Sequence, residues 1–179
     1  MQGVNTTLCY IEQNGSYLML HRVKKENDLN RDKWIGIGGK FEPGESPEDC
    51  VCREAREETG LTLIRPEYRG IVTFVSREWG TEYMHLFRAD TFTGTLRDCD
   101  EGTLEWIPKA RLREIPQWEG DKIFLRLLEE RAPFFSLKLC YEGDTLTEAV
   151  LNGQSLPTAA HLEQTEKDEK QERAEHAPQ

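Results

Sequence analysis

The stretch over residues 39–61 constrains this chain most, because it combines strong helix signals with a dense group of acidic residues. Ser46 is a favourable N-cap, and Pro47 suits the first helical position because its φ is preset and its missing N–H would have no helical partner. Gly60 can adopt the left-handed conformation that ends many helices. The pattern therefore predicts a helix over residues 47–59.

Three glutamates fall on one face of this predicted helix. Glu54, Glu57 and Glu58 are spaced i, i+3 and i+4, which places them about one turn apart. Like charges this close repel one another, and a hard divalent cation such as Mg²⁺ or Mn²⁺ would neutralise them through oxygen ligands. Taken alone, the spacing also fits a solvated acidic helix face. Val51 and Ala55 mark the opposite side, which we expect to face the core.

The wider pattern is more specific than the three glutamates. Gly39, Glu45, Arg53, the glutamates and Gly60 are spaced as G-x5-E-x7-R-E-A-x-E-E-x-G-L. This pattern resembles the Nudix box, although Ala55 stands where a bulky aliphatic residue is usual. The resemblance implies an α+β fold, namely a Nudix-type α/β/α sandwich with a mixed β-sheet. It also implies hydrolysis of a phosphoanhydride bond.

The resemblance implies roles for residues of the box. Glu54, Glu57 and Glu58 would be catalytic metal ligands, and this cluster is where a base could deprotonate the attacking water. Arg53 and Glu45 would hold the glutamates in place, and such supporting contacts matter for ligand orientation. Arg53 also precedes Glu57 by four residues, so the two can pair within the helix.

Two loops are candidates for further metal ligands. Many Nudix enzymes add a carboxylate from a distant loop, and Glu101 is the residue that we select from the acidic segment 98–101. The glycine-rich segment 34–40 can bring its backbone close to a ligand, so a carbonyl of Gly38 or Gly39 is a second candidate. A solvated acidic loop and a plain tight turn are the respective alternatives.

Two tryptophan-containing stretches resemble the oxidised-purine nucleoside triphosphatase branch of that family. The first contains Trp34, Ile35 and Lys40, and the second contains Trp118 and Asp121. The resemblance makes these five residues candidate substrate contacts, with Trp118 stacking on a base. A tryptophan that only packs in the core is the alternative for Trp118.

This chain departs from that branch where the base would be read. The branch carries an asparagine at the position of Ile35 and an aspartate at the position of Gly120. Hydrogen-bonding groups at such positions give selectivity for a purine edge. The resemblance therefore specifies the reaction class more firmly than it specifies the base.

Together these patterns predict a pyrophosphohydrolase that depends on Mg²⁺, with Mn²⁺ as the other candidate cofactor. It would cleave a nucleoside triphosphate, such as 8-oxo-dGTP, to a monophosphate and pyrophosphate. Two alternatives stay open: hydrolysis of another nucleoside diphosphate derivative, and a non-catalytic Nudix-like nucleotide sensor. The sequence lacks the G-x-x-x-x-G-K-[ST] pattern of a P-loop. An isomerase on this fold would need a catalytic cysteine, and none of the five cysteines stands out.

Composition limits the partners. The net charge of −10 disfavours binding to a nucleic-acid backbone, which needs a basic surface. The N-terminus lacks a signal segment, and no apolar run approaches the ~20 residues of a membrane span, so we expect no membrane association and a cytoplasmic location. We expect a small-molecule nucleotide as the partner of a monomer or homodimer. The odd number of scattered cysteines indicates reduced thiols.

The remaining pattern predicts one domain, residues 1–157, followed by a charged tail, residues 158–179. The tail has a single large aliphatic residue and cannot bury enough apolar area to fold alone, so it is expected to be disordered or a solvated helix. Helices are predicted at 47–59, 109–114 and 121–130. Strands are predicted at 6–11, 16–21, 70–75, 82–88, 104–107, 134–141 and 145–151, with Asn14-Gly15 joining the first two as a hairpin.

Overall fold

The computed structural model describes residues 3–24 and 28–159, so the predicted tail lies almost entirely outside the described residues. The centre of the fold is a mixed sheet of nine strands in the order β11-β10-β9-β5-β6-β1-β2-β3, with β8 paired to β2. Its strands are β1 (Val4–Gln13), β2 (Ser16–His21), β3 (Trp34–Ile35), β5 (Glu67–Ser76), β6 (Gly80–Ala89), β8 (Thr103–Pro108), β9 (Phe135–Glu142), β10 (Thr145–Leu151) and β11 (Gln154–Leu156).

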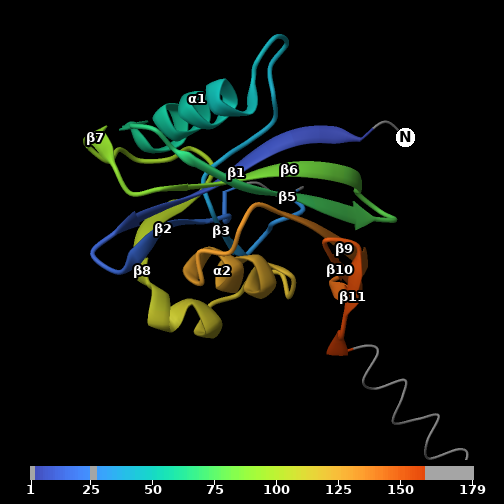
Figure 1. Cartoon of the computed structure of the whole chain (residues 1–179). Helices are drawn as coiled ribbons and strands as arrows, with labels where there is room; N and C mark the ends of the chain where they lie inside the picture. The colour runs from blue at the N-terminus through green and yellow to red at the C-terminus, as the bar shows by residue number, and fades with distance from the viewer. Residues whose placement is uncertain (1–2, 25–27, 160–179) are drawn as a thin grey trace, which may run out of the picture.

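Helices cover both faces of this sheet (Figure 1). Helix α1 (Pro47–Thr59) lies on one face, while α2 (Asp121–Glu129) and the 3₁₀ helix η1 (Lys109–Glu114) lie on the other. A small second sheet pairs β4 (Leu61–Leu63) with β7 (Phe92–Gly94) beyond the end of α1. The predicted α/β/α sandwich with a mixed sheet is confirmed, since β1 and β6 pair in parallel whereas β1 and β2 are antiparallel.

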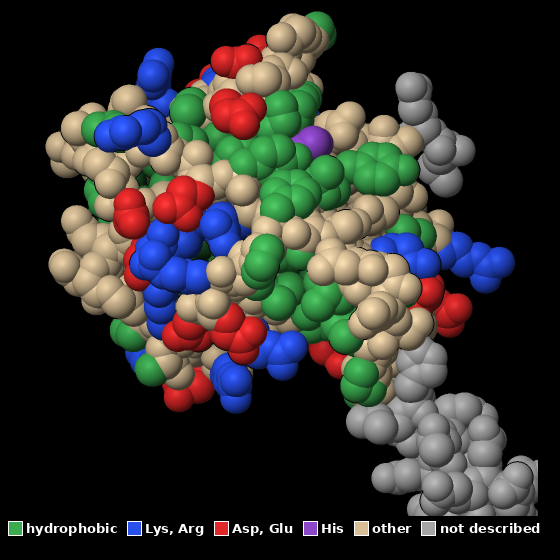
Figure 2. All heavy atoms as spheres, in the orientation of Figure 1, with side chains coloured by type: hydrophobic (Ala, Val, Ile, Leu, Met, Phe, Trp, Pro, Cys, Tyr) green, Lys and Arg blue, Asp and Glu red, His purple; other side chains and the backbone are tan. Residues whose placement is uncertain are grey.

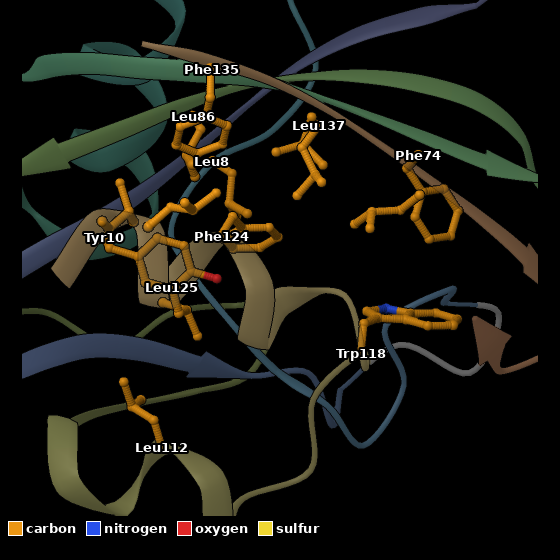
Figure 3. Packing of buried hydrophobic residues seen from close by; sticks show 14 of the residues in the cluster. Leu8, Tyr10, Phe74, Leu86, Leu112, Trp118, Phe124, Leu125, Phe135 and Leu137 are labelled. Carbon is orange, nitrogen blue, oxygen red and sulfur yellow. The ribbon is translucent and has the colours of Figure 1, made fainter. Parts of the chain in front are cut away.

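Helices α1 and α2 each pack on a separate hydrophobic core, one on each face of the sheet. On the α2 side, Phe124 packs among side chains that include Leu86 and Leu137 (Figure 3). On the α1 side, Val51 and Ala55 are buried in a second cluster, as the helix pattern predicted. The two clusters reflect the alternation of strand side chains, which point to opposite faces of the sheet.

Helix α1 begins and ends where its capping residues predict. The Ser46 side chain accepts a hydrogen bond from the Asp49 N–H at 3.1 Å, and the Ser46 N–H donates to the Asp49 carboxylate at 3.0 Å. This reciprocal capping box satisfies two backbone donors at the helix start. Gly60 ends the helix with a φ of 78°, in the left-handed region.

The longer strands agree with the sequence predictions, whereas four short ones were not predicted. Asn14 and Gly15 have φ values of 50° and 72°, as a tight hairpin turn between β1 and β2 requires. β3, β4, β7 and β11 have only two or three residues each, too few for a period-2 pattern. Segment 109–114 forms a helix as predicted, of the 3₁₀ type.

Two further findings concern cysteines and membranes. All five cysteines are free thiols, as predicted. No helix within residues 3–24 and 28–159 combines the length and apolar character needed to cross a membrane.

Candidate functional site

An acidic cavity of about 420 Å³ opens beside the second half of α1. One wall comes from the helix and the other from the segment that precedes β8. The lining residues are Glu54, Glu57, Glu58, Arg97, Asp98, Cys99, Asp100 and Glu101. The structure therefore brings Glu101 to the three box glutamates, although these residues are far apart in the sequence.

The three glutamates of α1 differ sharply in exposure. The Glu57 side chain is 58% exposed and that of Glu54 is 15% exposed, whereas Glu58 as a residue is only 7% exposed. Burial raises the pKa of Glu54, and it raises the pKa of Glu58 to about 8. A hydrogen bond from the Gly38 N–H at 3.1 Å opposes the shift of Glu58. A solvated helix face would not bury Glu58, so that alternative fits the structure poorly.

Arg53 holds the acidic residues around α1. Its Nε and Nη2 donate to the two Glu45 carboxylate oxygens at 2.6 and 2.9 Å. Its Nη1 donates to Glu54 at 2.7 Å and to Glu57 at 3.1 Å. The bonds from Arg53 to Glu45, followed by one from the Glu42 N–H, lower the pKa of Glu45 to about 2. The predicted pairing of Arg53 with Glu45 and Glu57 is observed, and Nη2 also binds the Lys40 carbonyl at 3.0 Å.

The glycine-rich segment lies wedged between β1 and α1. A Cβ at Gly38 would come within 2.0 Å of the Thr7 carbonyl oxygen, and one at Gly39 within 2.5 Å of the Glu54 carboxylate. At Gly38, where the obstacle is backbone, only glycine permits this approach, whereas the Glu54 side chain could move away from a Cβ at Gly39. The Gly39 carbonyl accepts the Thr7 N–H at 2.8 Å, while Gly38 contributes its N–H to Glu58. The predicted carbonyl ligand thus remains a prediction, and the observed contact is through an amide N–H.

The donor chemistry of the cavity fits a hard divalent cation. In the described part of the chain, no three acidic, histidine or cysteine side chains converge as a preformed metal site. Arg53 binds Glu54 and Glu57, and Arg22 binds Glu101. Carboxylate oxygens nevertheless outnumber the one thiol, Cys99, on the walls of this cavity, which suits Mg²⁺ or Mn²⁺. The residues that could hold the ion once their carboxylates turn inward are Glu54, Glu57, Glu58 and Glu101.

A second polar group lies on the α2 side of the sheet, around Trp118. This tryptophan is 6% exposed and lies beside Phe74 (Figure 3). Its ring meets those of Phe74 and Tyr141 at steep angles. The Lys33 ammonium lies 4.1 Å from the centroid of the Trp118 ring. Trp118 thus packs like a core residue, with a cation over its ring. Stacking of a base on it remains a prediction.

Asp121 is the buried acid of this second group. Burial raises the pKa of Asp121 to about 8, against a backbone hydrogen bond from Trp118 and the charge of Lys33. Tyr10 in β1 lies nearby, and its pKa is raised by burial and then by Asp121. The sequence reading missed Tyr10 and Lys33. The alternation of β1 could have signalled Tyr10, which points to the α2 side.

The other predicted substrate contacts separate in space. Trp34 stacks on His21 with ring centroids 4.5 Å apart and packs against the α2-side core. Ile35 packs against the α1-side core, so the structure does not bring it together with Trp118 and Asp121. Neighbouring residues of a strand point to opposite faces, which accounts for this separation. Lys40 is exposed at the entrance to α1.

Charged side chains are unevenly distributed on the surface. On the face shown in Figure 2, Lys and Arg side chains gather in one group bordered by Asp and Glu side chains. Hydrophobic side chains gather beside this group, over the part of the sheet that α1 leaves uncovered. A net charge of −10 therefore coexists with a local basic group on this face.

Comparison with known proteins gives consistent matches. The family model described as NUDIX domain matches residues 1–128. The "Uncharacterized Nudix hydrolase YvcI" of Bacillus subtilis (strain 168) is 34% identical over 123 residues, which are 64% of this chain and 72% of that protein. An "Oxidized purine nucleoside triphosphate hydrolase" of Danio rerio is 29% identical over 148 residues, covering 82% of this chain and 92% of that protein.

A solved structure supports the same grouping. The crystal structure of a mutator MutT protein from Bacillus halodurans superposes with a TM-score of 0.75 at 29% sequence identity. The match covers 84% of this chain and 99% of that one. The similarity thus extends well beyond the box to the arrangement of the sheet and helices.

Proposed function

This chain belongs to the Nudix family of hydrolases, which act on pyrophosphate bonds, and from that premise we propose that it uses Mg²⁺ to cleave a nucleoside triphosphate to a monophosphate and pyrophosphate. The observation that carries the proposal is the acidic cavity, where Glu58 is buried and Glu101 lines the wall opposite the box glutamates. An oxidised purine such as 8-oxo-dGTP is the first substrate to test, because the Danio rerio relative is named for that class.

The residues of the cavity divide into ligands and supports. A divalent cation, when bound, neutralises phosphoryl oxygens and lowers the pKa of a water molecule. Glu54, Glu57 and Glu58 would hold it from the helix. Arg53 would orient two of these carboxylates through the bonds described above, while Glu45 fixes the Arg53 guanidinium from the other side.

The α2-side group would hold the base. Asp121, with a pKa near 8, carries a proton at neutral pH and can donate it in a hydrogen bond to a purine edge. Trp118 would offer its ring for stacking if the base displaces Lys33 or enters at the other ring face. This arrangement supports a nucleotide as the ligand more than it supports any one base.

The proposal is tested by measuring pyrophosphate release from a panel of nucleoside triphosphates and diphosphate derivatives with Mg²⁺. We expect turnover of at least one triphosphate, and a loss of kcat of roughly 10²- to 10⁴-fold in Glu58→Gln. The control is Glu48→Gln, which changes an exposed glutamate of the same helix outside the cavity. Absence of turnover across the panel would overturn the proposal, and calorimetric binding without turnover would favour the nucleotide sensor.

A further inference from the structure

A continuous run of hydrogen bonds joins the α2-side group to the acidic cavity. The Trp118 Nε1–H donates to Asn30 Oδ1 at 2.8 Å, and the Asn30 N–H donates to Asp28 Oδ1 at 2.9 Å. The other Asp28 oxygen accepts from Arg22 Nε at 2.6 Å. Arg22 Nη1 then donates to Glu101. Four contacts thus connect the ring proposed for the base with a carboxylate proposed for the metal.

The middle of this run is well shielded from water. The side chains of Arg22 and Asp28 are 12% and 6% exposed. A charge-assisted hydrogen bond in such a place is strong, and removing one partner leaves the other buried without its counter-charge. Both oxygens of the Asp28 carboxylate are engaged, one on each side, so this carboxylate fixes two neighbours at once.

Two backbone hydrogen bonds also fix Arg22 at the start of the segment that follows β2. The Arg22 N–H donates to the Lys33 carbonyl at 3.0 Å, and the Asp32 N–H donates to the Arg22 carbonyl at 2.8 Å. These bonds tie the start of the segment after β2 to its end at β3. The backbone of Arg22 is therefore fixed, and Asp28 holds the Arg22 guanidinium through Nε and the Asn30 main chain through its N–H.

Arg22 also affects the cavity through its charge. Its Nη1 donates to Glu101, a carboxylate of the cavity wall, so a positive charge lies at this edge of the acidic site. Asp28 itself does not line the cavity. Any effect of Asp28 on the site must therefore pass through Arg22 or Asn30.

We propose that Asp28 is a positioning residue that sets Arg22 against Glu101 at the metal end and Asn30 against Trp118 at the base end. The inference rests on the proposed function, because it assigns the two ends to metal and base. One carboxylate outside both ends thereby holds them in a common geometry. Loss of its charge weakens its hold on Arg22 and thereby disturbs the metal end, while an oxygen at this position still accepts the Asn30 N–H.

The test compares Asp28→Asn with Asp32→Asn, a matched change of an exposed aspartate on the same segment. Asparagine keeps the size and one acceptor but loses the charge that pairs with Arg22. We expect Asp28→Asn to lower kcat by roughly 10- to 100-fold and to weaken Mn²⁺ binding, followed by electron paramagnetic resonance, by about 10-fold. Asp32→Asn should leave both within about twofold of the wild type.

A second pair of variants tests the Asn30–Trp118 contact at the base end separately from the Arg22–Glu101 contact at the metal end. Asn30→Ala removes the acceptor of the Trp118 N–H and leaves the Arg22–Asp28 pair in place. It should raise KM severalfold with kcat unchanged. In a Trp118→Phe background, which has no indole N–H, the effect of Asn30→Ala on KM should disappear, since the two changes remove one interaction.

Each set of variants has an outcome that would contradict the proposal. Unchanged kcat, KM and Mn²⁺ affinity in folded Asp28→Asn would overturn the proposal, and so would additive effects of Asn30→Ala and Trp118→Phe. Should Asp28→Asn not fold, Arg22→Lys, which keeps the positive charge but loses the planar fork that binds Asp28 and Glu101, tests the metal end by the same Mn²⁺ measurement, and unchanged affinity would overturn the proposal. If the wild type turns over no nucleotide, the proposed function fails, whereas Mn²⁺ binding to Asp28→Asn continues to test the positioning of Glu101.

Discussion

Two carboxyl groups, Glu58 and Asp121, are buried on opposite faces of the sheet, and burial raises the pKa of each to about 8. Neither has a cationic side chain as a direct hydrogen-bond partner in the part of the chain that the structure describes. Groups whose pKa is displaced this far by their surroundings gather at functional sites. Their burial agrees with the places that we propose for them, Glu58 at the metal end and Asp121 at the base end of the nucleotide site.

Asp121 should make stability depend on pH. Its pKa is about 8 in the folded protein and about 3.9 in an unfolded chain, so between these values only the folded state holds the proton. Its contribution is fully present below about pH 4 and declines by up to about 1.4 kcal/mol per pH unit until about pH 8. Asp121→Asn should remove this part of the decline, as measured by urea unfolding from pH 5 to pH 8.

The matched control for this prediction is Glu129→Gln, which alters an exposed carboxylate of the same helix. It should leave the pH dependence of the unfolding free energy unchanged. A slope for Asp121→Asn equal to that of the wild type would show that the Asp121 carboxyl ionises normally in the folded protein.

At the residue scale, local contacts were predictable and distant ones were not. Arg53 pairs with Glu57 as their spacing of four residues predicted, and with Glu45 as the resemblance implied, because all three belong to one helix and its entry. Asn30 binds Trp118 and Arg22 binds Glu101, and these partners lie far apart in the sequence. No periodic pattern relates such residues, so only the folded sheet reveals that they meet.

At the element scale, the close packing of the glycine-rich segment against β1 leads to a test. In Gly38→Ala, the new Cβ would overlap the Thr7 carbonyl oxygen, and backbone cannot yield as a side chain can. In Gly44→Ala, nothing lies within 4 Å, and only the positive φ of 88° is unfavourable. Gly44→Ala should cost about 1–2 kcal/mol of unfolding free energy, and Gly38→Ala should cost clearly more.

Denaturant unfolding of the two glycine variants measures this difference. Equal losses of stability would mean that β1 and the segment can separate at little cost. In that case Gly38 would not be needed for the hydrogen bond to Glu58.

Element prediction succeeded where a segment carries its own signal. The capping residues of α1 gave both ends of the helix, and Asn14-Gly15 located the first hairpin. β4 and β7 carry no such signal, because each is defined by its partner: Leu61 lies opposite Gly94. Their existence depends on tertiary pairing, which sequence patterns of three residues cannot express.

At the scale of the whole molecule, the boundary of the folded domain can be tested by truncation. Thr158 is only 3% exposed, so the folded part extends at least one residue past the predicted boundary at 157. A chain that ends at Ala159 should unfold at the same denaturant midpoint as the full chain, since residues 160–179 are poor in apolar side chains.

The control truncation ends at Leu156 and removes Thr158. It should lower the midpoint, because it exposes the surface that Thr158 covers. A lower midpoint for the chain that ends at Ala159 would instead assign a stabilising contact to residues 160–179.

The parallel pairing of β1 with β6 also affects how this protein is made. β1 is synthesised early, yet Val4 lies opposite Glu82, and β6 ends only at Ala89. Closing so long a loop slows folding relative to proteins built from local contacts. During translation, the β1 edge of the β1–β2 hairpin has no partner strand until β6 emerges from the ribosome. Such edges attract other chains, so nascent copies of this protein are most vulnerable to aggregation in that interval.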